Sequence, residues 1–283
     1  MAQWEIRQMR REELDQVVQW AQAEGWNPGR YDAQTYYAVD PEGFLLGLLD
    51  GKPIGAISAV RHNPEFGFVG FYLVLPAWRG KGFGLKLWHA AMARLAETVS
   101  GLDGVLARAR DYAQSGYVKH WQNVRFEGAC LGAIVAPQAW RIRRLGLADL
   151  PDVLALDRRV FPGTRHAFLM GWLGQPKSVA LGLHQDGALQ GFGVIRPADH
   201  GVRIGPLQAP DLARAQTLVQ ALIASQAPGT PVQIDVPDAN PAALQMAERL
   251  GLRQVFQTVR MYRGTPLAVD LSQLFGVASF ELG

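Results

Sequence analysis

Several features that mark particular classes of protein are scarce or missing in this sequence. Its single cysteine, Cys130, cannot form an intramolecular disulfide or a cysteine metal cage. We expect a free, buried thiol, in keeping with a reducing compartment. The sequence has no run of about 18 uncharged apolar residues, and residues 1–7 carry charges where a signal segment would be apolar. These absences predict a cytoplasmic protein without a membrane partner.

The excess of one charge sign is also small. Lysine and arginine together number 28 and the acidic residues 25, so the net charge of +3 gives no electrostatic reason to expect nucleic acid as a partner. Hydrophobic residues make up 48% of the chain and charged residues 19%, as in ordinary folded proteins. The chain has 283 residues, against about 150 for one typical domain, so its length predicts two domains or one large one.

An internal repeat supports this division. Its three clearest pairs of segments are 4–7 with 140–143, 46–48 with 181–183, and 121–125 with 256–260, at offsets of 136, 135 and 135 residues. A steady offset over several landmarks indicates a duplicated domain. We therefore predict one domain over residues 1–135 and a second over residues 138–283, joined near Pro137.

The hydrophobic pattern of the first half predicts alternating kinds of element. The expected strands are 4–9, a hairpin about Asp50-Gly51, 66–75, 105–109 and 119–126, and the expected helices are 12–23, 33–38 and 82–98, with a short helical turn before the last strand. This order predicts a mixed α+β fold.

The segment from Pro76 to Leu85 is the most informative part of the chain. It delivers an apolar strand through a glycine-rich turn directly into an amphipathic helix, so that unpaired backbone N–H groups converge at the helix start. Such a place binds anions, and glycine lets a phosphate approach the backbone closely. The turn is neither a P-loop, because Lys81 precedes Gly82, nor a dinucleotide fingerprint, because Leu87 stands where glycine is needed.

Arg79, Gly82 and Gly84 match the pattern [QR]-x-x-G-x-[GA] between a strand and a helix. Here the sequence resembles the GNAT superfamily of acyl-CoA-dependent N-acetyltransferases, and the repeat makes it similar to the tandem GNAT proteins. The resemblance implies two tandem GNAT-like domains, each with a central mixed, mostly antiparallel sheet flanked by helices. It also implies acetyl-CoA as co-substrate and no bound metal.

The resemblance assigns the cofactor site to the strand end and the turn. A bulge should splay the strand from its neighbour, so that the strand backbone lines the pantetheine arm and the turn amides hold the pyrophosphate. The residues concerned are Leu73, Val74 and Leu75 for the arm, and Arg79, Gly80, Lys81, Gly82, Phe83, Gly84 and Leu85 for the pyrophosphate.

Tyr112 precedes Gly116-Tyr117 in the pattern Y-x-x-x-G-[FY], in which GNAT proteins carry a general acid. The resemblance implies that Tyr112 protonates the leaving thiolate, whereas packing of the ring under a turn is the alternative. No carboxylate stands on the strand 66–75. Glu65, just before it, is the candidate general base, with a solvated strand-edge glutamate as the alternative. His62 and His120 are weaker candidates.

In these folds the loop between the first two helices usually holds the acceptor. We expect Trp26 and Tyr31 to stack on it, Asn27 to line the pocket, and Asp32 or Glu24 to pair with an ammonium group. A turn made by residues 27–29, with Asp32 capping the next helix, explains the same residues equally well.

The second half has lost the features of this site. Residues 79–84 align with 213–218, which contain no glycine, and Tyr112 aligns with Ala247. We expect a degenerate domain that completes the acceptor pocket, forms a homodimer contact or stabilises the first half, with its tail 275–281 packed as a last strand.

Together these features predict an N-acetyltransferase that moves an acetyl group from acetyl-CoA to a primary amine. The acceptor is expected to be a small molecule, with a protein lysine as a variant. A non-catalytic acyl-CoA-binding sensor or interaction module is the alternative.

Overall fold

The computed structural model describes residues 3–129 and 140–283, so Cys130 and the expected joint at Pro137 lie outside the described residues. The elements of the first half are β1 (Trp4–Gln8), α1 (Arg11–Ala23), α2 (Asp32–Val39), β2 (Phe44–Leu49), β3 (Lys52–Arg61), β4 (Phe66–Val74), α3 (Phe83–Arg94), β5 (Val99–Val105), α4 (Ala109–Gln114) and β6 (Val118–Ala129). Those of the second half are β7 (Arg141–Arg144), α5 (Leu150–Asp157), α6 (His166–Leu173), β8 (Val179–Gln185), β9 (Ala188–Pro197), β10 (Val202–Gln208), α7 (Leu212–Ala224), β11 (Pro231–Pro237), α8 (Pro241–Arg249), β12 (Arg253–Arg263) and β13 (Leu274–Gly276).

The strands form one mixed, mostly antiparallel sheet that runs through both halves. Its order is β1-β2-β3-β4-β5-β12-β6-β11-β10-β9-β8-β7, and β13 pairs with β10. The only parallel neighbours among the described strands are β4 with β5 and β10 with β11. Each half thus repeats the order of the other, as the sequence repeat predicts.

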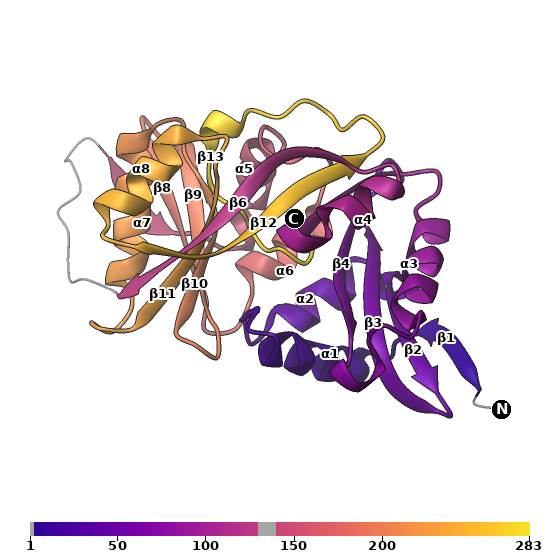
Figure 1. The fold of residues 1–283 in the computed structure, drawn as a ribbon. Coiled ribbons are helices and arrows are strands. Elements are labelled where there is room, and N and C mark those ends of the chain that lie inside the picture. The colour runs from indigo at the N-terminus through magenta and orange to yellow at the C-terminus, as the bar shows by residue number, and fades with distance from the viewer. Residues whose placement is uncertain (1–2, 130–139) are drawn as a thin grey trace.

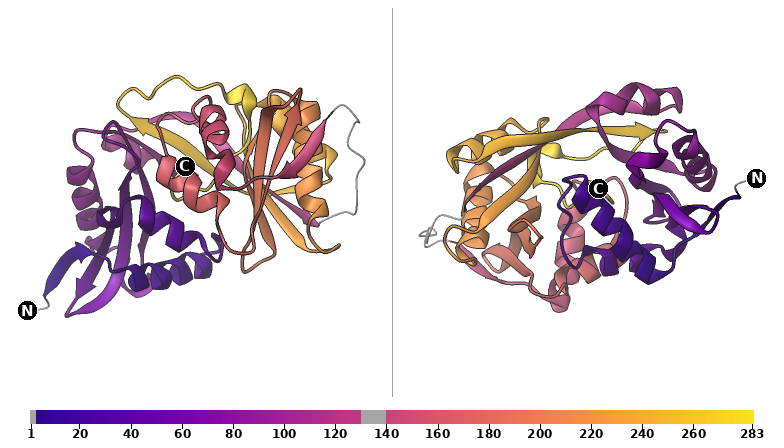
Figure 2. Two further views of the ribbon diagram at one scale, coloured as in Figure 1. Left: turned by 180° about the vertical axis from the view of Figure 1, so that it is seen from behind. Right: turned by 60° about the horizontal axis from the view of Figure 1, so that its bottom comes forward.

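The two halves exchange their last strands. β12 of the second half pairs with β5 of the first, and β6 of the first half pairs with β11 of the second. The two exchanged strands also pair with each other, from Val118 to Glu127 on β6. Figures 1 and 2 show β6 and β12 as long strands that cross from one lobe to the other. The sheet therefore does not divide at the boundary of the repeat.

Each exchanged strand is fastened by a buried ion pair. On β12 the guanidinium of Arg260 donates to Asp103 of β5 at 2.8 and 2.6 Å. On β6 the guanidinium of Arg125 donates to Asp235 of β11 at 2.7 and 3.0 Å. The two arginines are 135 residues apart, so both pairs derive from the repeat. Bidentate pairs of this kind fix register as well as contributing energy.

One hydrophobic core spans both halves. Residues of α1 and α2 cluster with residues of α5 and α6, and the ring of Tyr36 stacks on Trp172 at 5.8 Å between centroids. The chain end also contributes, because Ala278 and Leu282 are buried in the same core. Figure 2 shows the C-terminus between the lobes and the N-terminus at the far side of the first.

The structure corrects two expected elements. The helix expected over 82–98 ends at Arg94, and the strand expected over 105–109 is instead β5, while Ala109 begins α4. Glycines within β5 interrupt the residue pattern by which a strand is predicted from sequence. A Cβ at Gly101 would press on the rings of Tyr262 and Phe68, and one at Gly104 would collide with the ring of Tyr112. Close packing here requires glycine, which sequence propensity disfavours in strands.

We expect Asp103→Asn to lower the free energy of unfolding by about 3–5 kcal/mol, because Arg260 then stays buried without an ionised partner. The double variant Asp103→Leu, Arg260→Met should lose clearly less free energy of unfolding than Asp103→Asn, because it leaves no unpaired buried charge. Urea unfolding measures both, with Asp15→Asn as the control, since its partner Arg11 is exposed on α1 and the change should stay within about 1 kcal/mol. A loss for Asp103→Asn no larger than that of the control would contradict this role.

Candidate functional site

The glycine-rich turn has the geometry of an anion site. Gly80 and Gly82 have φ of +73° and +82°, and Gly82 is the N-cap of α3. Within the described part of the chain, the backbone N–H groups of residues 80–85 have no hydrogen-bond acceptor. These amides lie at the positive end of a helix dipole, where an anionic group is stabilised.

An open cleft lies against this turn. Of the ten residues predicted to bind the cofactor, those that line the cleft are Leu73, Val74, Arg79, Gly80, Gly84 and Leu85. Leu75, Lys81, Gly82 and Phe83 belong to the same turn but do not line it. The Lys81 ammonium donates to the Ala77 carbonyl, and Arg79 is held by the Val74 carbonyl and the Glu24 carboxylate. Because both cationic side chains are engaged with protein groups, the donors left for an anion in the turn are mainly backbone N–H groups.

β4 parts from β5 beside this cleft. The two strands pair only from Phe66 to Val69 on β4, and the rest of β4 has no partner on that side among the described strands. One extra residue lies between Gly70 and Leu73 relative to β3, and Phe71 has φ of +45°, a strained value for a bulky residue. The predicted bulge and splay are confirmed, and they open the sheet to a ligand.

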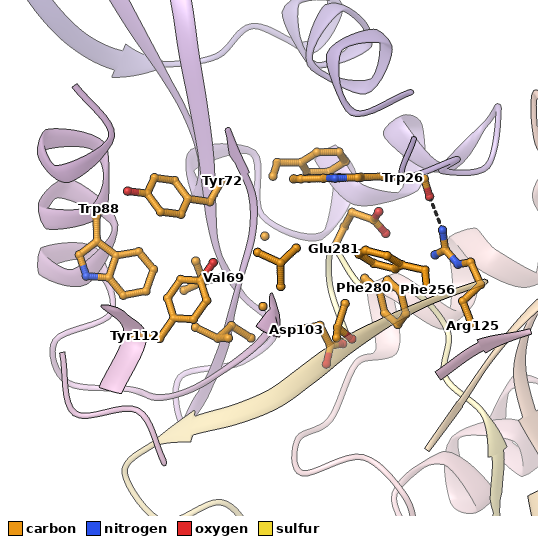
Figure 3. Close-up of a pocket in the computed structure, with 16 residues that line it drawn as sticks. Trp26, Val69, Tyr72, Trp88, Asp103, Tyr112, Arg125, Phe256, Phe280 and Glu281 are labelled. Carbon is orange, nitrogen blue, oxygen red and sulfur yellow. Dashed lines mark hydrogen bonds between the residues drawn. The ribbon is translucent and has the colours of Figure 1, made fainter. Parts of the chain in front are cut away.

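A second cavity adjoins the cleft at this opening. The two cavities share the lining residues Trp26, Tyr72, Trp88, Val105 and Tyr112. Figure 3 shows Tyr72, Trp88 and Tyr112 on one side of this inner pocket and Trp26, Phe280 and Glu281 on the other. A ligand in the cleft can therefore meet a second ligand in the pocket through the gap between β4 and β5.

Tyr112 occupies the junction between the two cavities. It is carried by the short helix α4, and its hydroxyl has no hydrogen-bond partner in residues 3–129 and 140–283. Burial raises the pKa of Tyr112 to about 12, so the hydroxyl keeps its proton at neutral pH and can donate it. Its placement fits the predicted general acid.

The predicted acceptor loop contributes only part of what the sequence indicates. Trp26 lines both cavities. Asn27 instead bridges the halves through the backbone of His200, and Tyr31 lines neither cavity. Asp32 is fully buried, and its carboxylate accepts from Arg196, Gln175, the Gly29 amide and Tyr36. With every acceptor position taken, Asp32 is not available for an ammonium group, which corrects that expectation.

The candidate bases near the start of β4 also lie away from the pocket. Glu65 is exposed, whereas the two cavities are lined by the other end of β4. The expectation for Glu65 is corrected because strand length separates it from the opening. His62 is held by the Leu282 carbonyl at 2.8 Å, and burial lowers its pKa to about 4. His120 is exposed on β6.

The inner pocket owes several of its walls to segments that the sequence did not indicate. Arg125 comes from β6, Phe256 and Thr258 from β12, and Phe280 and Glu281 from the chain end. The hydroxyl of Thr258 is buried without a hydrogen-bond partner among the described residues. Two signals were present: the repeated Val-Arg of β6 and β12, and a lone glutamate within the apolar run from residue 274 to residue 282.

The equivalent place in the second half is closed to an anion. The side chain of Asp211 caps α7 by accepting from the Arg214 amide at 2.9 Å. A carboxylate thus already uses the helix start and would repel a phosphate. Ala247, the counterpart of Tyr112, is buried in α8.

Comparisons with known proteins agree with this geometry. The Acetyltransferase (GNAT) family matches residues 5–119, and the Acetyltransferase (GNAT) domain matches residues 153–276. A protein of Pseudoalteromonas sp. (strain SANK 73390), named holothin acyltransferase, is 31% identical over 281 residues, which is 99% of this chain and 95% of the relative. The chain belongs to the GNAT acyltransferase family.

Solved structures of the GNAT family share its fold. A candidate acetyltransferase from Pyrococcus horikoshii has a TM-score of 0.82 at 19% identity, over 99% of this chain and 96% of the other. The tandem GNAT protein from the clavulanic acid biosynthesis pathway has a TM-score of 0.64 at 15% identity, over 93% and 99%. The present chain is a tandem GNAT protein.

Two features are absent from the described residues. No helix between residues 3 and 129 or between 140 and 283 is both long and apolar enough to span a membrane. The same residues contain no group of three or more His, Cys, Asp and Glu side chains that could hold a metal ion.

Gly84→Asp should weaken acetyl-CoA binding at least about tenfold, or about 1.4 kcal/mol, because a carboxylate would stand in the first turn of α3 and a Cβ there already presses on the Tyr72 hydroxyl. Calorimetry gives the affinity. Ala213→Asp, in the first turn of α7, is the matched control and should bind as the wild type does. An unchanged affinity for acetyl-CoA in a folded Gly84→Asp protein would show that the turn does not bind this molecule.

Proposed function

We propose that this chain is an acetyl-CoA-dependent N-acetyltransferase whose acceptor is the primary amine of a small cyclic molecule. The observation that carries the proposal is the meeting of the two cavities at Tyr112, through the gap between β4 and β5. A thioester laid along β4 from the cleft would face an amine held in the inner pocket. Direct transfer needs only this approach and a proton donor.

The unpaired amides and the splayed strand fit an acyl-CoA. The amides of residues 80–85 would hold its pyrophosphate, and the free edge of β4 would bind the pantetheine arm as a neighbouring strand does. When bound, the acyl-CoA supplies the acyl group as a thioester. Side chains at the glycine positions would fill this space, which is why the degenerate second half is expected to bind no second molecule.

The character of the inner pocket supports a small cyclic acceptor. Its apolar walls include the rings of Trp26, Phe256 and Phe280, and aromatic walls favour flat, ring-shaped ligands. The polar side chains in its wall include Arg125, Thr258 and Glu281, which can form hydrogen bonds with a ligand. The relative from Pseudoalteromonas is named for acyl transfer to a single compound, holothin, which supports a small molecule over a protein lysine.

Tyr112 would complete the reaction. The amine forms the C–N bond, the C–S bond breaks, and the sulfur takes the electron pair. The Tyr112 hydroxyl protonates this sulfur as it leaves, which gives the free thiol, and the surplus proton of the nitrogen restores Tyr112. The raised pKa of Tyr112 keeps this proton in place until the sulfur becomes basic.

Tyr112→Phe keeps the ring and removes the hydroxyl, so acetyl-CoA should still bind while turnover falls roughly 10²-fold. Thiol release from acetyl-CoA, measured over a panel of cyclic and open-chain amines, amino acids and polyamines, reports turnover. Tyr117→Phe is the matched control, because its hydroxyl bonds Ser100 at 2.7 Å and lines neither cavity. Full activity of Tyr112→Phe would show that another group donates the proton to the leaving sulfur.

The panel also decides between catalysis and sensing. Binding of acetyl-CoA with no thiol release for any amine would favour the non-catalytic sensor. Release with polyamines or open-chain amines only would contradict the proposed cyclic acceptor.

A further inference from the structure

The chain end crosses from the second half into the site of the first. After β13 it runs under β4, where a Cβ at Gly70 would collide with the main chain of Glu281. It is anchored on both sides of Glu281, by the bond between Arg196 and the Ala278 carbonyl and by that between His62 and the Leu282 carbonyl. Phe280 and Glu281 therefore have a fixed place in the wall of the inner pocket.

Glu281 is a carboxylate with few protein partners. Only 3% of the residue is exposed, yet its only hydrogen bond among the described residues comes from Tyr36, at 3.2 Å. The same Tyr36 hydroxyl lies 3.2 Å from the Asp32 carboxylate and has one proton for both. A buried carboxylate normally has its oxygens satisfied. Glu281 lines the inner pocket, from which a ligand can supply the missing donor.

The charges around Glu281 favour its ionised form as a whole. The groups that face it come from four elements: Asp32 and Tyr36 from α2, Arg125 from β6, Arg196 from β9 and Arg203 from β10. The three arginines carry three positive charges, whereas Asp32 and Asp235 supply only two negative ones. An ionised Glu281 makes this cluster neutral.

We propose that Glu281 is the general base of this acyltransferase and takes the proton that an acceptor ammonium group must lose before attack. The proposal rests on the proposed function, since it names the base of that same site. In Figure 3 Glu281 and Tyr112 stand on opposite sides of the inner pocket, so that one side receives a proton and the other gives one. The swapped arrangement of the chain delivers the base from the second half.

The ammonium nitrogen passes one proton to the Glu281 carboxylate, and its free electron pair forms the C–N bond with the thioester carbon. The C–S bond breaks, and the sulfur takes the electron pair together with the Tyr112 proton. The second proton of the nitrogen restores Tyr112, and the proton on Glu281 passes to solvent. The products are the amide, the thiol and one proton.

Burial raises the pKa of Glu281, against the opposing effect of Arg203. A base must be unprotonated, so activity should fall as the pH falls through this pKa, in a range above that of an ordinary glutamate. Tyr36→Phe removes the one donor to the carboxylate and should move this acid limb to higher pH. An acid limb of the pH–activity profile that lies at the same pH in Tyr36→Phe as in the wild type would contradict the assignment of Glu281 as the base.

Glu281→Gln tests the base directly, because it keeps the shape of the side chain. Benzylamine is an ammonium ion at neutral pH, whereas aniline is already neutral, and both fit an aromatic pocket. We expect Glu281→Gln to lower kcat/KM for benzylamine about 10²-fold, with the deficit shrinking as the pH rises, and to change that for aniline less than threefold. Glu97→Gln, an exposed glutamate on the turn after α3, is the matched control.

A direct binding measurement separates this proposal from the proposed function. With CoA present, so that no transfer occurs, benzylamine should bind Glu281→Gln at least tenfold more weakly than the wild type, and aniline equally well. Equal binding of benzylamine, or an equal loss of activity with both amines, would overturn the role of Glu281. A wild type that acetylates no amine of the panel would overturn the proposed function, and the binding experiment would still decide on Glu281.

Discussion

Two buried arginine–aspartate pairs, related by the internal repeat, make this molecule one unit rather than two. Arg260 with Asp103 holds β12 to the first half, and Arg125 with Asp235 holds β6 to the second. A buried ion pair costs desolvation, so its value lies in fixing which strand pairs with which partner and in what register. Every wall that the inner pocket takes from β6 and β12 depends on that choice.

The ion pairs are equivalent in sequence but not in environment. Burial raises the pKa of Asp103, which has the single guanidinium of Arg260 beside it. Burial acts on Asp235 in the same direction, but Arg125 and Arg203 together outweigh it and lower its pKa. The second guanidinium, that of Arg203, also donates to the backbone of Trp26 and Asn27 and so ties the acceptor loop to the second half.

The sequence indicated most of the elements and the glycine-rich turn, because these depend on local residues. The turn needs only Gly80, Gly82 and a helix start, all within one short segment. The strand exchange could not be predicted, since the repeat gives β6 and β12 similar sequences that fit the same neighbour equally well. β5 was missed because packing against Tyr112 and Tyr262 demands glycines there. The acceptor wall was missed because its members are distant in sequence.

The central claim is that the two halves build one acyl transfer site at their joint. It is tested most directly by a crystal structure with CoA and the acetylated form of the best amine from the panel. We predict one CoA per chain on the amides of residues 80–85, and the product amide between Trp26 and Phe280, with its nitrogen facing Glu281 and its acetyl group toward Tyr112. CoA bound at the start of α7, or a product held outside the inner pocket, would contradict the account.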